Sequence, residues 1–153
     1  FPNGAHVCEL EVDPETGRVA IVKITTLDDV GHPVNPLIVF GQLQGGMAQG
    51  IGQALLEQAV YDPENGQPLT GSFMDYCMPR ADDLPSMDVN LDESVPCTTN
   101  PLGAKGCGES GTVGITAAVV AAVLDALAPL GVADIQMPMT PDRVWQAIRD
   151  AGA

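Results

Sequence analysis

Basic residues are scarce in this sequence. Six Lys and Arg stand against 20 Asp and Glu, which leaves a formal net charge of −14 at pH 7. Binding to nucleic acid or to an anionic membrane surface requires clustered cations, so this charge balance argues against both as partners. The acidity itself is explained most simply by solubility.

Long hydrophobic runs are also lacking. The most apolar stretch, residues 115–130, contains Thr116 and Asp125 and is shorter than the roughly 20 residues that span a bilayer. We therefore expect no membrane-spanning helix. The first residues lack the charged and apolar regions of a signal peptide, and there is no initiator Met. We expect a fragment or processed product of a longer, cytoplasmic protein.

Cysteines are few and widely spaced. No two of the four are placed as in the C-x-x-C pattern of zinc and redox sites. His6 and Cys8 lie two apart on an expected strand and share one side, but two ligands do not make a metal site. We expect no metal ligand among these side chains, and reduced, buried thiols in an intracellular protein. The four are Cys8, Cys77, Cys97 and Cys107.

The remaining pattern favours one α+β domain. With 153 residues, 45% of them hydrophobic, the chain is large enough for a real core. Residues 5–12 and 18–27 have the pattern of half-buried strands, and the Pro and Gly of residues 13–17 join them in an N-terminal β-hairpin. Residues 69–77 and 86–93 are expected to be further short, extended segments.

Three helices are expected between and after these strands. The first begins with Asn35 as its N-cap and Pro36 in its first turn, and runs to about residue 58. The second, from about residue 111 to 128, has apolar residues on nearly all faces and should be buried. Residues 140–142 cap a short last helix that carries Val144, Trp145 and Ile148.

Five glycines interrupt the first helix between residues 41 and 53. Each costs roughly 0.8–1 kcal/mol relative to Ala, so close packing or the close approach of a ligand must offset them. Gly41, Gly45 and Gly52 fall near one side of the helix, and three glutamines share a face. Amide side chains offer donors and acceptors and suit a polar ligand, although they also suit a wet surface. The three are Gln42, Gln49 and Gln53.

A second Gly-rich segment, residues 103–111, leads into the apolar helix. It lacks the Lys-Ser/Thr spacing of a P-loop, and no G-x-G-x-x-G dinucleotide fingerprint joins a strand to a helix. Glycines allow backbone N–H groups to approach an anion, and the helix dipole adds to this. Glu109 lies where the loop meets the helix. It is either a functional carboxylate or an ordinary first-turn acid.

Taken in order along nearly the whole chain, these segments resemble the large subunit of molybdenum hydroxylases of the xanthine oxidase, aldehyde oxidase and CO dehydrogenase family. Any one segment is weak evidence, whereas the ordered set is specific. The matching segments are FPNG at 1–4, DDVGHPVNP at 28–36, GQLQGG and QG within 41–50, GSFMDY at 71–76, and GAKGCGES at 103–110.

The resemblance implies that residues 1–153 form a single domain, a C-terminal fragment of the second molybdenum-cofactor-binding domain. It implies a molybdopterin, which in bacteria usually has the cytosine dinucleotide form. Glu109 matches the family's active-site base, which takes a proton from a water-derived oxygen beside the molybdenum. Gln49 matches a glutamine near the metal end of the cofactor. The loop that packs against the pterin, chiefly through backbone N–H groups, is matched by Lys105, Gly106, Cys107 and Gly108.

The resemblance also implies partners: the rest of the large subunit, an iron–sulfur subunit or domain, and in some members an FAD subunit. The complete enzyme would oxidise an aldehyde, an N-heterocycle or CO. This chain alone should hold only part of the cofactor and should not turn over. Prepared by itself, it could form homo-oligomers through a surface that the missing parts normally cover. The alternative is a non-catalytic cofactor-binding or assembly module that retains the fold.

Overall fold

A three-stranded sheet forms one layer of the fold. The computed structural model describes residues 1–152. Strands β1 (Asn3–Val12) and β2 (Val19–Asp29) form the expected antiparallel hairpin, and β3 (Ser86–Leu91) pairs parallel to β2, so that β2 is central. The α+β class and the strand expected over residues 86–93 are confirmed.

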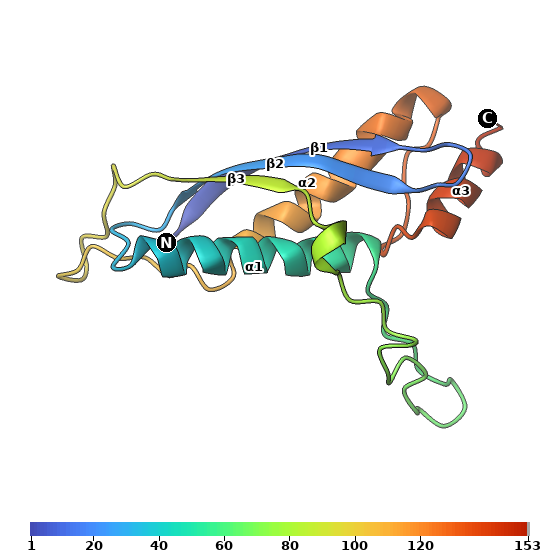
Figure 1. The fold of residues 1–153 in the computed structure, drawn as a ribbon, viewed down its shortest axis with the longest axis horizontal. Coiled ribbons are helices and arrows are strands. Elements are labelled where there is room, and N and C mark those ends of the chain that lie inside the picture. The colour runs from blue at the N-terminus through green and yellow to red at the C-terminus, as the bar shows by residue number, and fades with distance from the viewer. Residues whose placement is uncertain (153) are drawn as a thin grey trace.

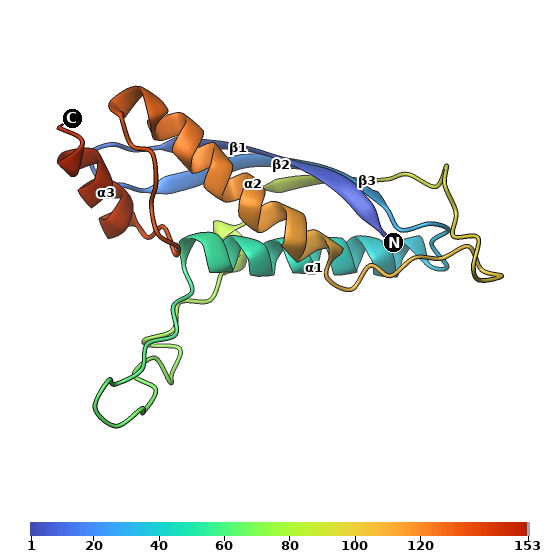
Figure 2. The same ribbon diagram turned by 180° about the vertical axis from the view of Figure 1, so that it is seen from behind.

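Two long helices lie against one face of the sheet and cross each other (Figures 1 and 2). Helix α1 (Pro36–Leu55) begins as expected, because the Asn35 side chain accepts hydrogen bonds from the backbone N–H groups of Leu37 and Ile38. It ends three residues before the expected boundary at residue 58. Helix α2 (Ser110–Leu127) starts at the end of the Gly-rich loop and continues into the short 3-10 helix η2 (Ala128–Leu130).

Helix α3 (Pro141–Asp150) lies at the far end of the sheet, beside the β1–β2 turn (Figure 1). Thr140 occupies its N-cap position, but the Thr140 side chain makes no capping hydrogen bond. The residue expected to cap the helix is therefore in the N-cap position, but its side chain does not bond to the helix backbone. Val144 and Ile148 are buried, whereas Trp145 keeps 38% of its surface exposed.

The main core lies between the sheet and the helices. Its fully buried members come from β2, α1, α2 and α3, and they include Ile24, Met47, Ile51, Ile115, Val119 and Val123. A smaller cluster of Val30, Val39 and Leu43 lies where β2 ends and α1 begins. The two clusters hold the end of β2 and the start of α2 in fixed relation, and the candidate site lies between these ends.

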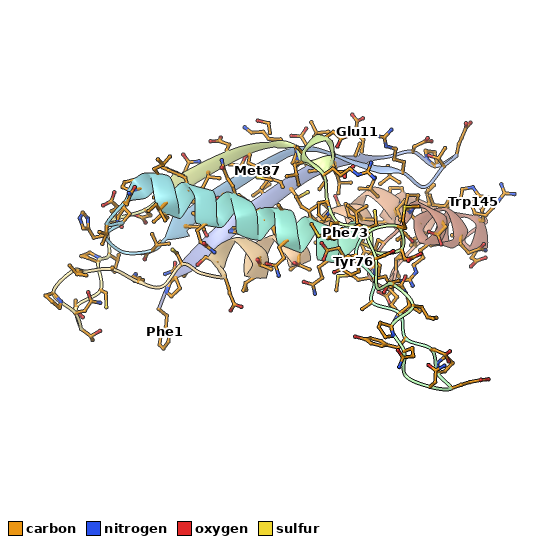
Figure 3. The ribbon with its side chains drawn as sticks, turned by 60° about the horizontal axis from the view of Figure 1, so that its bottom comes forward. Phe1, Glu11, Phe73, Tyr76, Met87 and Trp145 are labelled. Atoms are coloured by element: carbon orange, nitrogen blue, oxygen red, sulfur yellow. The ribbon has the colours of Figure 1, made fainter. Side chains whose placement is uncertain are left out.

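The extended segment expected over residues 69–77 was wrong. These residues form turns within an arm, residues 57–80, that projects from the body after α1 (Figure 1). The amide nitrogens of Asp75 and Tyr76 donate to the carbonyl of Ser72. Local turn bonds of this kind satisfy the backbone without a partner strand. Figure 3 shows Phe73 and Tyr76 on this arm.

The burial expected for the second helix was also wrong. Only one stripe of α2 is buried, and Val113 is 74% exposed on another face. Together α2 and η2, Ser110–Leu130, have 21 residues and are long and apolar enough to cross a membrane by length and composition alone. A core helix of a globular domain passes the same test, and the buried stripe of Ile115, Val119, Val123 and Leu127 packs in the core.

Candidate active site

Glu109 occupies the N-cap position of α2, at the junction with the Gly-rich loop. Its side chain makes no capping hydrogen bond, and the first turn of α2 contains no acidic residue. The carboxylate is therefore exposed at the positive end of the helix dipole rather than used to cap the helix. This position suits a negative charge without committing it to a structural role.

A cleft of about 440 Å³ opens beside Glu109. Its sheet side is formed by the start of β1 and the end of β2, and its helix side by the Gly-rich loop and the first turns of α2. Three of the residues predicted for the site line it: Glu109, Gly106 and Gly108. The opposite wall contains Asn3, Gly4, His6 and Asp28.

The loop before Glu109 is fastened to the segment that follows β2. The Lys105 ammonium group pairs with Asp29, and the two side chains are 8% and 9% exposed. The amide nitrogen of Lys105 donates to the carbonyl of Val30 at 2.8 Å, and that of Gly31 donates to the Asp29 carboxylate at 2.9 Å. The Lys105 ammonium, and after it the Gly31 N–H, hold the pKa of Asp29 below its ordinary value.

Three predicted residues do not line the cleft. Lys105 and Cys107 border a separate, mostly apolar hollow at the start of α1. Cys107 packs there against the small cluster of Val30, Val39 and Leu43. Gln49 is exposed on α1 and makes no contact with the cleft. The structure thus brings Glu109 together with the two glycines and keeps the other three side chains apart from them.

Gln42 contacts the loop, although it was not among the predicted site residues. Its side-chain amide donates a hydrogen bond to the carbonyl of Gly108 at 2.7 Å, directly before Glu109. The sequence signal was present, because Gln42 shares a helix face with Gln49 and Gln53. Periodicity alone does not reveal which of the three meets a loop that is 66 residues away in sequence.

A buried His–Asp pair forms part of the cleft wall. His6 Nε2 lies 3.1 Å from Asp28 Oδ1, and the two side chains are 4% and 3% exposed. Their other polar atoms, His6 Nδ1 and Asp28 Oδ2, have no hydrogen-bond partner among the described residues. The sequence pattern points to His6 only through its spacing from Cys8, and no metal site was expected there. Burial raises the pKa of the Cys8 thiol to about 11, so this thiol stays protonated and is a poor ligand.

Within residues 1–152, no three His, Cys, Asp or Glu side chains are grouped as a metal ion requires. The four cysteines are all unpaired. Cys77 is exposed on the arm, contrary to the expectation of buried thiols, and the other three are partly buried.

The loop wall of the cleft leaves room for a ligand to approach the backbone. A Cβ atom added at Gly106 or Gly108 would meet no atom within 4 Å, so the loop backbone is open to close approach. Gly41 and Gly45 on α1 are equally open, whereas Gly46 and Gly50 pack against α2. Close packing therefore accounts for Gly46 and Gly50, and the approach of a ligand to Gly41 and Gly45 stays a prediction. Asp28 Oδ2 and His6 Nδ1, on the opposite side, are buried behind the wall and are not exposed in the cleft.

Comparison with known proteins identifies the class. Residues 1–85 match the family described as the molybdopterin cofactor-binding domain. The chain belongs to this family, as the sequence resemblance implied.

The relatives are subunits of oxidoreductases. The chain is 42% identical to the nicotine 6-hydroxylase large subunit of Paenarthrobacter nicotinovorans, over 97% of this chain and 18% of that protein. It is 36% identical to the carbon monoxide dehydrogenase large chain of Hydrogenophaga pseudoflava, over 98% of this chain and 18% of that one. The quinoline 2-oxidoreductase structure from Pseudomonas putida 86 matches with a TM-score of 0.92 and 42% identity, over 97% of this chain and 19% of that chain. The chain thus spans about a fifth of the length of these relatives.

Proposed function

We propose that this chain is part of the large subunit of a molybdenum hydroxylase, with Glu109 as its active-site base. The observation that carries the proposal is the placement of Glu109, an uncommitted carboxylate at the start of a helix, on the wall of a cleft whose loop backbone is open. The complete enzyme would oxidise an aldehyde, an N-heterocycle or CO with oxygen from water. The names of the relatives, which include a nicotine hydroxylase and a carbon monoxide dehydrogenase, support this range.

The chain's own residues would hold the cofactor and move one proton. The molybdenum cofactor would supply the two-electron oxidation of the substrate. Gly106 and Gly108 would let the pterin approach the loop backbone, and Cys107 would contribute its peptide group while its side chain packs in the small apolar cluster. Because the Lys105 N–H already donates to a carbonyl of the segment after β2, Lys105 would act by fastening the loop. A carboxylate oxygen of Glu109 would accept the proton of a water-derived oxygen within hydrogen-bond reach.

Gln49 lies outside the cleft and would contact a part of the cofactor that extends beyond it, whereas Gln42 would hold the Gly108 peptide in place. We further propose the cytosine dinucleotide form of the molybdopterin. The proposed partners are the remainder of the large subunit, an iron–sulfur subunit and, in some complexes, an FAD subunit. We place the complex in the cytoplasm. Since the chain spans about a fifth of its relatives, the remaining walls of the cleft would come from the rest of the large subunit.

Substitution of Glu109 in the full-length enzyme tests the base. Glu109→Gln keeps the size of the side chain and removes the basic oxygen. We expect the turnover number to fall by roughly 10²–10⁴-fold while the molybdenum content stays near normal, because general base catalysis contributes factors of that size. Turnover is measured with the native substrate after screening, and molybdenum by mass spectrometry of the metal.

Glu11→Gln is the matched control, since Glu11 lies on the sheet away from the cleft (Figure 3). A fully active Glu109→Gln enzyme would contradict the assignment of the base. The non-catalytic alternative is tested on source cells with an antibody to this chain. A native polypeptide of about 15.9 kDa without molybdenum would favour that alternative over the proposed enzyme.

A further inference from the structure

Two adjacent carboxylates at the end of β2 hold the two flanks of the Glu109 segment. Asp29 pairs with Lys105, four residues before Glu109. The Asp28 carboxylate lies within hydrogen-bond distance of His6. The His6 ring packs against Gly114, five residues after Glu109. A Cβ atom added at Gly114 would lie only 2.6 Å from His6 Nδ1. The ring therefore fills the space beside the first turns of α2.

The His6–Asp28 pair has features that fold stability alone does not explain. Both side chains are nearly fully buried, and each retains a polar atom without a partner among the described residues. Such atoms are rare in folded proteins because their lost hydration is not replaced, and they occur where a functional constraint outweighs this cost. The pair lines the same cleft as Glu109.

We propose that His6 and Asp28 are positioning residues for Glu109: the carboxylate of Asp28 orients the His6 ring, and the ring fixes the first turns of α2 and so the direction of the Glu109 side chain. The inference rests on the proposed role of Glu109 as the base. A base must lie within about 0.5 Å of its productive position. An anchor on each side of Glu109 supplies that precision better than the Lys105–Asp29 pair alone.

The test uses the full-length holoenzyme and two variants that leave Glu109 intact. Asp28→Asn keeps the shape of the side chain and removes its charge. Gly114→Ala keeps both members of the pair but places a methyl group where the His6 ring lies. Asp88→Asn is the matched control, because Asp88 is an exposed carboxylate on the neighbouring strand β3. Displacement of a catalytic group by about 1 Å costs up to ~100-fold in rate, so we expect roughly 10- to 100-fold losses of kcat with little change in KM.

Two readouts separate positioning from general destabilisation. Amide hydrogen exchange should increase in the peptide of residues 105–116 and stay unchanged in that of residues 19–27. In an enzyme that already carries Glu109→Gln, Asp28→Asn should have almost no further effect on kcat, because a residue that acts through Glu109 has nothing left to position. If Asp28→Asn does not fold, Gly114→Ala is measured in the same two ways.

Unchanged exchange in residues 105–116, or an equal loss of kcat with and without Glu109, would overturn the inference. Failure of the proposed function gives a different result. In that case the wild-type polypeptide lacks molybdenum, or Glu109→Gln remains active, while the exchange measurement still reports on the His6–Asp28 anchor.

Discussion

Lys105 is one of two lysines in the chain, and its side chain points away from the cleft that its own loop borders. Its ammonium group is used to hold Asp29 at the end of β2. A buried ion pair adds little stability compared with apolar residues, but it fixes geometry because loss of either partner leaves the other charge unpaired. Lys105 therefore acts on the candidate site by placing the backbone of the loop.

The Lys105–Asp29 pair predicts a specific acid sensitivity. Because the pKa of Asp29 in the folded chain lies below the ordinary 3.8, the pair stabilises the fold fully above pH 3.8. That contribution is lost as the pH falls through the lowered pKa. Lys105→Met should lower the free energy of unfolding above pH 3.8 and flatten its decline in acid. Urea unfolding of the chain, followed by the fluorescence of its single Trp145, measures this.

Lys23→Met is the control for that experiment. Lys23 pairs with Asp88 at 3.4 Å, but both side chains are about half exposed. Water screens such a pair, so its loss should change the unfolding free energy little and leave the acid limb of the profile unaltered. An equal effect of the two lysine variants would mean that the anchoring of the loop is not what Lys105 provides.

Single residues of the site were predictable to different degrees. The Gly-rich loop and the helix start at Glu109 could be recognised because they are contiguous in sequence. The site roles of Glu109, Gly106 and Gly108 came from the family resemblance and stay predictions. The His6–Asp28 pair was missed because its members are 22 residues apart and meet only through the register of the β1–β2 hairpin. Gln42 was missed for a similar reason. A helical face can be read from spacing, whereas the loop that crosses it depends on tertiary packing.

At the scale of elements, the crossing of α1 and α2 sets the position of the Glu109 end of α2. Gly46 and Gly50 let the helices approach closely, and the hydroxyl of Thr112 donates to the carbonyl of Gly46 at 2.9 Å. A Cβ atom at Gly50 would lie 2.3 Å from a methyl group of Ile115. The close packing that Gly46 and Gly50 allow at the crossing thus offsets the stability that these two glycines cost within the helix.

Two alanine substitutions on α1 should therefore have opposite effects. Gly50→Ala overpacks the crossing and should lower the unfolding free energy by about 1–3 kcal/mol. Gly45→Ala adds a methyl group in open space and should raise it by about 0.5–1 kcal/mol, because Ala restricts the unfolded chain more than Gly does. Urea unfolding of both variants at neutral pH gives the comparison. Similar values for the two would show that the crossing is not tightly packed.

Local patterns predicted the hairpin, the start of α1 at Asn35 and the position of α2, because each depends on neighbouring residues. Local patterns failed where the structure of a segment depends on its contacts with the rest of the fold. Residues 69–77 have a composition that suits a strand, but no strand among the described residues pairs with them, and turn bonds form instead. The composition of α2 indicated burial on all sides, yet the described residues cover only one stripe of it.

At the scale of the whole molecule, the described residues leave large apolar side chains uncovered on the helical side. Leu37 and Ile38 at the start of α1 are 80% and 67% exposed, and Val113 on α2 is 74% exposed. Patches of this kind on an isolated domain favour association. The chain spans about a fifth of its relatives, so we propose that the rest of the large subunit covers this surface in the complete protein.

The 153-residue chain prepared alone should therefore self-associate. Light scattering is expected to give a mass that rises with concentration, and Ile38→Lys should reduce it because a charge replaces an apolar contact. The direction of the change in association distinguishes an apolar contact from an electrostatic effect. The net charge of −14 makes copies repel one another, so an added Lys would increase association if electrostatics governed it. Ser86→Lys, at an exposed position of β3, adds the same charge away from the helices and measures that electrostatic effect. A clean monomer at every concentration would mean that the exposed apolar side chains are too dispersed to form a contact.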